Sequence, residues 1–205
     1  MRSLHRILGL LLAAPFLVWT ATGLLFHLKP GWSAAYDMLS AERADAEVKP
    51  AELAPLPAVA ASRVEAFSTV LGPMWRVTHG AETDLYDGKT ARRISPLTED
   101  AAVALARDAV TRSSHAAAYG ESRSAATDAD AVVVYFAGGP EVSVDRHTAR
   151  LFRSGPDTRR IDWYYRVHYL QWTGKPLFDR IFAVVAIALT WVLTLVGIRL
   201  FLRRK

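Results

Sequence analysis

Two long apolar runs, one at each end of the chain, constrain this sequence more than any other feature. The first, residues 7–26, holds twenty residues without a charge, and the second, residues 181–198, holds eighteen. At about 1.5 Å of rise per residue, either run can cross a hydrocarbon layer of about 30 Å as a helix, the second with modest mismatch. We therefore predict two helices that span a lipid bilayer, within residues 1–28 and 178–202. The first is interpreted as an uncleaved anchor, because its run is longer than the apolar core of a signal peptide.

The charges that flank the two runs predict their orientation. Six of the 25 basic residues lie just outside the runs, at Arg2, Arg6, Arg199, Arg203, Arg204 and Lys205. The chain between the spans then has 19 basic and 20 acidic residues, a net charge of −1. By the positive-inside rule, both termini and the tail 203–205 are cytoplasmic and residues 28–180 lie outside. The basic character belongs to the anchors, so it gives no reason to expect a nucleic acid as a partner.

The chain has no cysteine, which limits the chemistry that it can carry out. Disulfides, thiolate metal sites, iron–sulfur clusters and covalently attached haem c are excluded. The sequence also lacks a Gly-rich phosphate loop, a Gly-x-Ser-x-Gly turn and a His-Glu-x-x-His helix, so no machinery for hydrolysis is visible. A metal site would have to use histidine, methionine, tyrosine or carboxylate ligands.

Between the spans, the sequence predicts an α+β domain of helices and antiparallel hairpins at residues 57–156, after a linker at 29–56 that is rich in Ala and Pro. Periodicity predicts helices over 57–72 and from 99 to about 113, the latter capped by Thr98, and a strand over 74–78. Residues 120–130 are expected to form a loop, and residues 131–137 a buried strand. Hairpins are expected over 85–95 and 141–154. An aromatic segment, 157–177, is predicted to lie at the membrane interface before the second span.

The two predicted hairpins resemble each other. "YDGKTARRIS" and "VDRHTARLFRS" share an Asp, a Thr-Ala-Arg triplet and a closing Ser, 58 residues apart. Independent use of the same turn residues is one explanation. Duplication of a unit of helix and hairpin is the other, and it is slightly favoured.

Several stretches resemble one family of membrane proteins. "EVSVDRHTARL" is similar to the end of the PepSY domain, which has a valine-rich strand, an Asp and a hairpin with Thr. "LHRILGLLLAAPFLVWTATGLLF" resembles the first transmembrane segment of PepSY-associated transmembrane proteins, and residues 163–205 resemble a later one, with an aromatic-flanked histidine before the span. The resemblance implies a bacterial inner-membrane protein with a periplasmic PepSY-like domain.

The resemblance also suggests a chemistry. Larger members, with four or more spans, are associated with iron uptake and reduce ferric siderophores, using haem b held between transmembrane histidines. This chain departs from them because it has two spans and no flavin or nicotinamide domain, so it would be an electron-transfer or reductase component that receives electrons from another protein.

His27 and His168 are the candidate haem ligands. If residues 163–172 form an amphipathic segment in the interface, His168 descends to the level of His27, and two neutral imidazoles can hold a haem b from both sides. Arg166 and Lys175 are then placed to neutralise the propionates. The alternative is that both histidines are ordinary residues of an interfacial aromatic belt.

His5 lies 22 residues before His27, about 33 Å along a helix, so the two cannot bind one iron. An inner haem would need His5 from two chains or from a partner, and a role in anchoring the first span is the preferred interpretation. Small residues on both spans predict close helix contacts and therefore a homodimer or a partner membrane protein.

Three functions are compatible with these features. The first is haem-dependent electron transfer, with a ferric siderophore as a possible acceptor. The second is a non-enzymatic periplasmic binding or regulatory module held by two anchors. A siderophore-transport accessory without haem is a third.

Overall fold

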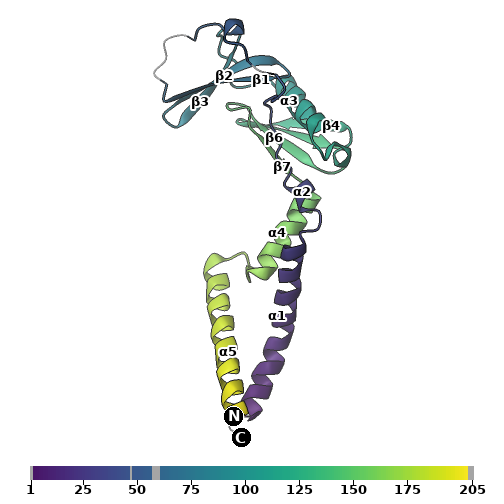
Figure 1. The fold of residues 1–205 in the computed structure, drawn as a ribbon, viewed down its shortest axis with the longest axis vertical. Coiled ribbons are helices and arrows are strands. Elements are labelled where there is room, and N and C mark those ends of the chain that lie inside the picture. Colours follow the sequence, from purple (N-terminus) through teal and green to yellow (C-terminus); the bar gives the residue numbers. More distant parts are fainter. Residues whose placement is uncertain (1, 47, 57–60, 203–205) are drawn as a thin grey trace. The chain divides into compact units, whose positions relative to one another are not determined.

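The computed structural model describes residues 2–46, 48–56 and 61–202, and it divides into two compact units. The first unit contains residues 1–32 and 159–205, and the second contains residues 33–158. The first holds α1 (Arg2–Leu28), most of α4 (Pro156–His168) and α5 (Pro176–Leu202) (Figure 1). The elements of the second are listed here in chain order: α2 (Trp32–Ala35, at the boundary), η1 (Pro50–Glu52), β1 (Arg63–Thr69), β2 (Gly72–His79), β3 (Glu82–Asp87), α3 (Glu99–Arg112), η2 (Ala116–Ala118), β4 (Ser122–Thr127), β5 (Ala131–Phe136), β6 (Glu141–Asp145) and β7 (Leu151–Ser154).

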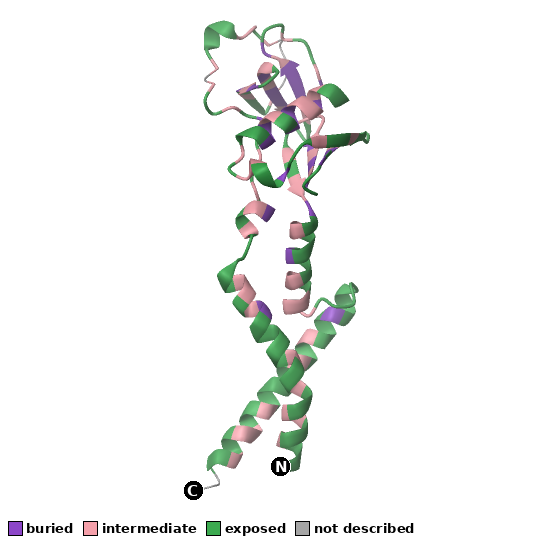
Figure 2. Ribbon diagram, turned by 90° about the vertical axis from the view of Figure 1, so that its right-hand side faces the viewer, coloured by how far each residue is buried: buried purple, intermediate pink, exposed green. Residues whose placement is uncertain are grey.

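The predicted fold class is confirmed: two apolar terminal helices flank an α+β region with antiparallel sheets. Among the described residues, two helices are long and apolar enough to cross a membrane, Ser3–Leu28 and Pro176–Leu202. Their side chains are mostly exposed, whereas the buried residues gather in residues 33–158 (Figure 2). Exposure of this many Leu, Ile and Val side chains costs little only if lipid covers them.

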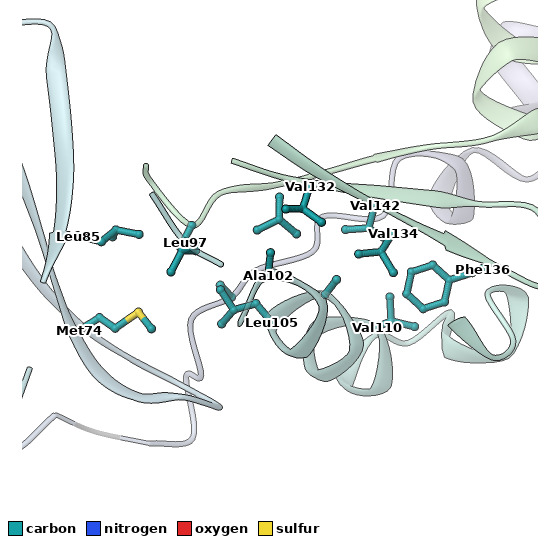
Figure 3. Packing of buried hydrophobic residues seen from close by; sticks show 14 of the residues in the cluster. Met74, Leu85, Leu97, Ala102, Leu105, Val110, Val132, Val134, Phe136 and Val142 are labelled. Carbon is teal, nitrogen blue, oxygen red and sulfur yellow. The ribbon is translucent and has the colours of Figure 1, made fainter. Parts of the chain in front are cut away.

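The second unit has two antiparallel sheets that share one core. The strand orders are β1-β2-β3 and β4-β5-β6-β7. α3 packs on the four-stranded sheet, and its Leu105 meets inward valines such as Val132 and Val142, while Met74 and Leu85 of the other sheet belong to the same cluster (Figure 3). Every second residue of β5 and β6 is buried, which is the pattern expected of a sheet with one covered face.

Several predicted elements are confirmed, and two are wrong. The helix capped by Thr98, the buried strand and the second hairpin form as expected, and the Thr98 hydroxyl accepts a hydrogen bond from Ala101 N at 3.3 Å. The helix expected over 57–72 is β1 from Arg63 onward, while residues 57–60 lie outside the described residues. Pairing of Phe67 with Met74 across the β1–β2 hairpin overrides the four-residue spacing.

The loop expected over 120–130 contains β4. Its sequence, Ser-Arg-Ser-Ala-Ala-Thr, has a weak preference for strand structure. It forms because the valine-rich β5 supplies a ladder of partners, with Ala126 opposite Val133. The prediction failed because the segment's own residues do not favour a strand, and the neighbouring strand β5 determines its structure. The first predicted hairpin is only partly formed, since the arm after β3 makes one isolated bridge, between Tyr86 and Arg93.

The turns that follow β3 and β6 have the same hydrogen bonds. Asp87 Oδ1 accepts from the amides of Lys89 and Thr90, at 3.0 and 2.8 Å. Asp145 Oδ1 accepts from those of His147 and Thr148, at 2.9 and 2.8 Å. The next residues, Ala91 and Ala149, have φ values of 54° and 55° and donate to the carbonyls of Asp87 and Asp145, respectively. This match favours duplication, and the repeated unit is three strands and a turn rather than a helix and a hairpin.

A buried polar cluster fixes the segments at the two ends of the second unit. Asp37 accepts hydrogen bonds from Ser113 and, at 2.9 Å, from the Tyr119 hydroxyl. Arg153, whose side chain is 2% exposed, donates to the Ala35 carbonyl at 2.7 Å and pairs with Asp157. Burial, with the Asp37 carboxylate next in importance, raises the pKa of the Tyr119 hydroxyl, so this group remains a hydrogen-bond donor. The cluster therefore joins residues 35–37 to β7 and to the start of α4.

Asp84 ties β3 to the segment after it and should make stability depend on pH. Burial acts to raise the pKa of its carboxyl, but hydrogen bonds from Arg93 and Ser95 outweigh it, and the pKa falls below its ordinary value of 3.8. A lowered folded-state pKa stabilises the fold above the ordinary value, and this contribution is lost as the pH falls toward the folded-state value.

We expect Asp84→Asn to destabilise the protein by about 2 kcal/mol at pH 7, because Arg93 and Ser95 lose a charged acceptor. The difference from the unmodified protein should shrink between pH 5 and pH 3, as followed by thermal unfolding in one detergent. Asp45→Asn, at an exposed position, is the matched control. A pH-independent difference would contradict the role assigned to the ionised carboxylate.

Candidate functional site

His168 is the last residue of α4, and the local sequence fixes where that helix ends. Pro156 and Asp157 occupy its first turn, as suits a helix start. At the other end, Leu170 adopts a left-handed φ of 57°, and Gln171 N donates to the Arg166 carbonyl at 2.8 Å. This closes the helix in the manner of a Schellman cap with a leucine in the usual glycine position. Within the predicted interfacial segment, residues 157–168 are therefore helix, residues 169–175 form the connection, and residues 176–177 already belong to α5.

The His168 ring packs on one face of α1. It stacks on the Trp19 ring, with centroids 5.3 Å apart and an interplanar angle of 10°. It meets the Phe26 ring edge-on at 4.7 Å, and a Cβ added at Gly23 would lie 3.6 Å from its Cε1. Positions 19, 22, 23 and 26 share one helical face, so α1 forms a continuous surface for the imidazole.

The side chain of Thr22 fixes the orientation of this imidazole. Thr22 Oγ1 lies 3.0 Å from His168 Nδ1 and 2.9 Å from the carbonyls of both Val18 and Trp19. A hydroxyl has one hydrogen, and a helical threonine directs it to the carbonyl of the preceding turn. Oγ1 then accepts from Nδ1–H, and this tautomer leaves the lone pair on Nε2. The same arrangement, with one ring nitrogen held by a neighbour, orients metal-binding histidines.

More aromatic rings surround the histidine. Tyr165, one turn earlier on α4, stacks on Phe26 at 4.7 Å and lies 5.4 Å from the Trp32 ring. Tyr169 stacks on Tyr165 at 6.1 Å and meets His168 edge-on at 5.4 Å. These contacts hold the end of α4 against α1.

His27 is not brought against His168. It is exposed, one helical turn beyond Gly23, and among the described residues its ring contacts no other aromatic ring. Facing ligation by the pair stays a prediction, since the side chain of His27 is free to adopt other rotamers.

Arg166 and Lys175 both lie by the turn between α4 and α5, and both are exposed. A terminal nitrogen of Arg166 is 3.4 Å from where a Gly174 Cβ would lie, and Lys175 Nζ is 5.9 Å from the centroid of the Phe178 ring. Asp179 holds this turn by accepting from the amide and hydroxyl of Thr173, at 3.0 and 2.8 Å. Arg166 and Lys175 therefore lie near the end of α4, which is also the end that carries His168.

His5 occupies the opposite end of α1. Its Cε1 lies 3.0 Å from the position of a Cβ added at Gly197, so a larger residue there would collide with the ring. Its Nδ1 is buried and has no hydrogen-bond partner among the described residues. His5 therefore packs at the contact between α1 and α5.

An apolar groove of about 720 Å³ runs between α1 and α5. Ala13 and Trp19 line it on α1, and Phe182, Ala186 and Thr190 do so on α5. Trp19 also carries the stacked His168, so the groove and the histidine share one wall. The structure brings Thr22 and Trp19 into the site, and sequence analysis missed both. Their spacing with Gly23 and Phe26 was the available signal.

The donors at His168 can be compared with what a haem and a bare metal ion each require. Among the described residues, no group of three or more His, Cys, Asp and Glu side chains could hold a metal ion. A haem supplies four of its own ligands to the iron, so it needs only one or two imidazoles and an apolar surround. His168 with its oriented ring fits that need as one ligand.

These features define a membrane protein in which two apolar helices flank an α+β domain with antiparallel sheets. The family model described as PepSY-associated TM region matches residues 1–204, and the chain belongs to this family. No curated protein and no solved structure matches the chain.

The Thr22–His168 hydrogen bond can be tested without any cofactor. Thr22→Val should destabilise the protein by about 1 kcal/mol, because Nδ1 loses its acceptor, and should lower the unfolding midpoint by about 2–4 °C. Thr20→Val is the matched control, because the Thr20 hydroxyl bonds only to carbonyls of its own helix, those of Phe16 and Leu17. Equal midpoints for the two variants would show that the bond contributes nothing.

Proposed function

We propose that this protein binds haem b through His168, with His27 as the second ligand, and takes part in electron transfer to ferric iron, of which a ferric siderophore is one form. The observation that carries the proposal is the oriented His168 imidazole, with Nδ1 held by Thr22 and with Nε2 left to bind iron. When bound, haem would supply one-electron transfer through its iron.

The surroundings of His168 support this proposal. Trp19 and Phe26 shield two sides of the imidazole, and the adjoining groove is lined almost entirely by apolar side chains. An apolar surround and one oriented imidazole are what a haem requires of a protein. Arg166 and Lys175, at the turn beside His168, are the proposed partners of the haem propionates.

His27 is the proposed second ligand. It is exposed and lies one helical turn beyond Gly23, on the helix against which His168 packs. His5 packs against Gly197 at the far end of α1, which supports its role in anchoring the first span. A second haem at that end would need a histidine from another chain.

We further propose that the protein lies in a bacterial inner membrane, with cytoplasmic termini and a periplasmic second unit, and that it works as a homodimer or with a partner membrane protein. Both candidate spans are almost entirely exposed along their length, and small residues on them permit close helix contact. A partner would also supply the electrons, because the described residues form no flavin or nicotinamide domain.

The haem proposal is tested by the absorption spectrum of the detergent-purified protein, oxidised and then reduced with dithionite. We expect the bands of a six-coordinate b-type haem. His168→Ala should abolish haem binding, and His27→Ala should weaken it or leave a five-coordinate spectrum. His115→Ala, in the second unit, is the control and should retain full haem content.

A protein that stays colourless after haem titration would overturn the proposal and favour the non-enzymatic binding module. Full haem content in His27→Ala, with loss in His168→Ala, would remove only His27 from the site. Thr22→Val should lower haem affinity by about 10- to 100-fold if Thr22 orients the ligand.

The orientation has a clean test, because the chain contains no cysteine. Met38 is 94% exposed in the second unit. Met38→Cys should react with a membrane-impermeant maleimide in intact cells whose outer membrane admits the reagent. Ser3→Cys should react only after the inner membrane is permeabilised. The opposite pattern would reverse the proposed topology.

A further inference from the structure

The second unit contains a separate cavity of about 290 Å³, which the haem proposal does not use. Three parts of the chain enclose it: residues 39–42, the β1–β2 pair at Glu65 and Arg76, and residues 149–152 at the β6–β7 turn and on β7. It therefore lies between the two strand units that end in matching turns. At about 30 Å³ for each water-sized group, it has room for a molecule of up to about ten non-hydrogen atoms.

Arg76 dominates the chemistry of this cavity. Its side chain is 8% exposed, and Phe67 lies under the guanidinium at 4.3 Å. Nε donates to the Thr148 carbonyl at 2.9 Å, and Nη1 lies 3.1 Å from Glu42 and 3.4 Å from Glu65. The remaining terminal nitrogen, Nη2, makes no hydrogen bond to a described residue and is not among the buried unpaired atoms. The two N–H groups of a rigidly held, nearly buried guanidinium are therefore available at the cavity.

Two further donors border the cavity. Arg150 is exposed, and its guanidinium makes no ion pair with a described residue. The Ser40 hydroxyl accepts from Glu42 N at 3.0 Å, and its own hydrogen is not engaged by a described residue. Three N–H or O–H groups from three segments thus converge on one space.

The charges around the cavity favour an anion. Glu42 and Glu65 are both turned to Arg76 Nη1, and Glu65 also pairs with Arg63 at 2.5 Å. Burial acts to raise the pKa of Glu65, but the two arginines lower it by more, so the carboxylate is ionised and paired. The lining itself holds two arginines and two glutamates. Both glutamates face Arg76, and Glu65 is shared with Arg63 outside the lining, so Arg150 has no acidic partner among the described residues.

The remaining walls are apolar. Leu39, Leu151 and Phe152 line the cavity, and Phe152 is 61% exposed at the edge strand β7. A large aromatic side chain that stays exposed beside unpaired donors is a common feature of small-molecule sites.

We infer that this cavity binds a small carboxylate with a short apolar body, its carboxylate between Arg76 Nη2 and Arg150 and its apolar part against Leu39, Leu151 and Phe152. A carboxylate matches guanidinium donors in geometry and charge.

The test uses the full chain in detergent, isothermal titration calorimetry, and acetate, butyrate and hexanoate as probes. Affinity should rise from acetate to hexanoate, because each added methylene buries apolar area. Hexanamide, which has the same shape without the charge, should bind at least tenfold more weakly than hexanoate.

Arg150→Gln and Ser40→Ala should each leave the fold intact, and Arg150→Gln should weaken hexanoate binding by about tenfold. Arg123→Gln, at an exposed position on β4 away from the cavity, should bind like the unmodified protein. Absence of binding for every carboxylate, equal binding of hexanamide, or unchanged affinity in Arg150→Gln would each overturn the inference.

Discussion

The bilayer imposes the constraint on which the first unit depends, because a polar group within a span must find its partner inside the protein. The threonines show how the chain meets it: Thr20, Thr190 and Thr194 turn their hydroxyls back to carbonyls of their own helices. Thr22 does the same and also reaches the imidazole of His168. This is the point at which a polar contact joins α1 to α4, and the aromatic packing is arranged around it.

The second unit depends instead on two turns whose backbone amides are hydrogen-bonded by an Asp side chain of the same turn. Asp87 and Asp145 each accept two amide hydrogen bonds within one turn, and each turn ends in an alanine with positive φ. Because the hydrogen bonds of each turn lie within it, the side chain of the following residue is not needed to maintain the turn. Arg150 follows the second turn and reaches the cavity beside Arg76, while Thr148 within that turn receives the Arg76 hydrogen bond. A repeated structural unit thus places non-equivalent residues at a binding site.

Elements determined by their own residues could be predicted from the sequence, whereas elements determined by a partner strand or a distant segment could not. The Thr98 cap and the spans could be predicted because local sequence and length determine them. β1 and β4 could not, because Phe67 and Ala126 are placed by partners on neighbouring strands. In the site, the aromatic surroundings of His168 indicated its importance, and the spacing of Thr22 with Gly23 and Phe26 marks one face of α1. That this face meets His168, which is 146 positions from Thr22, is not visible in a local pattern. The cavity at Arg76 was missed for the same reason, since its walls come from three distant segments.

The hydrogen bond to Thr22 suits both a structural role of His168 and the ligand role that we propose for it. A histidine that only fastened α4 to α1 would need one polar contact, and Nδ1 makes it. The stacking of Trp19 and the edge contact of Phe26 then fix the plane of the ring, which fastening alone would not require. If His168 binds a metal as we propose, a fixed ring plane lowers the entropy cost of binding, because the ligand is already oriented. His168 can therefore hold α4 against α1 and serve as the proposed ligand at the same time, because the two roles use different nitrogens of its ring.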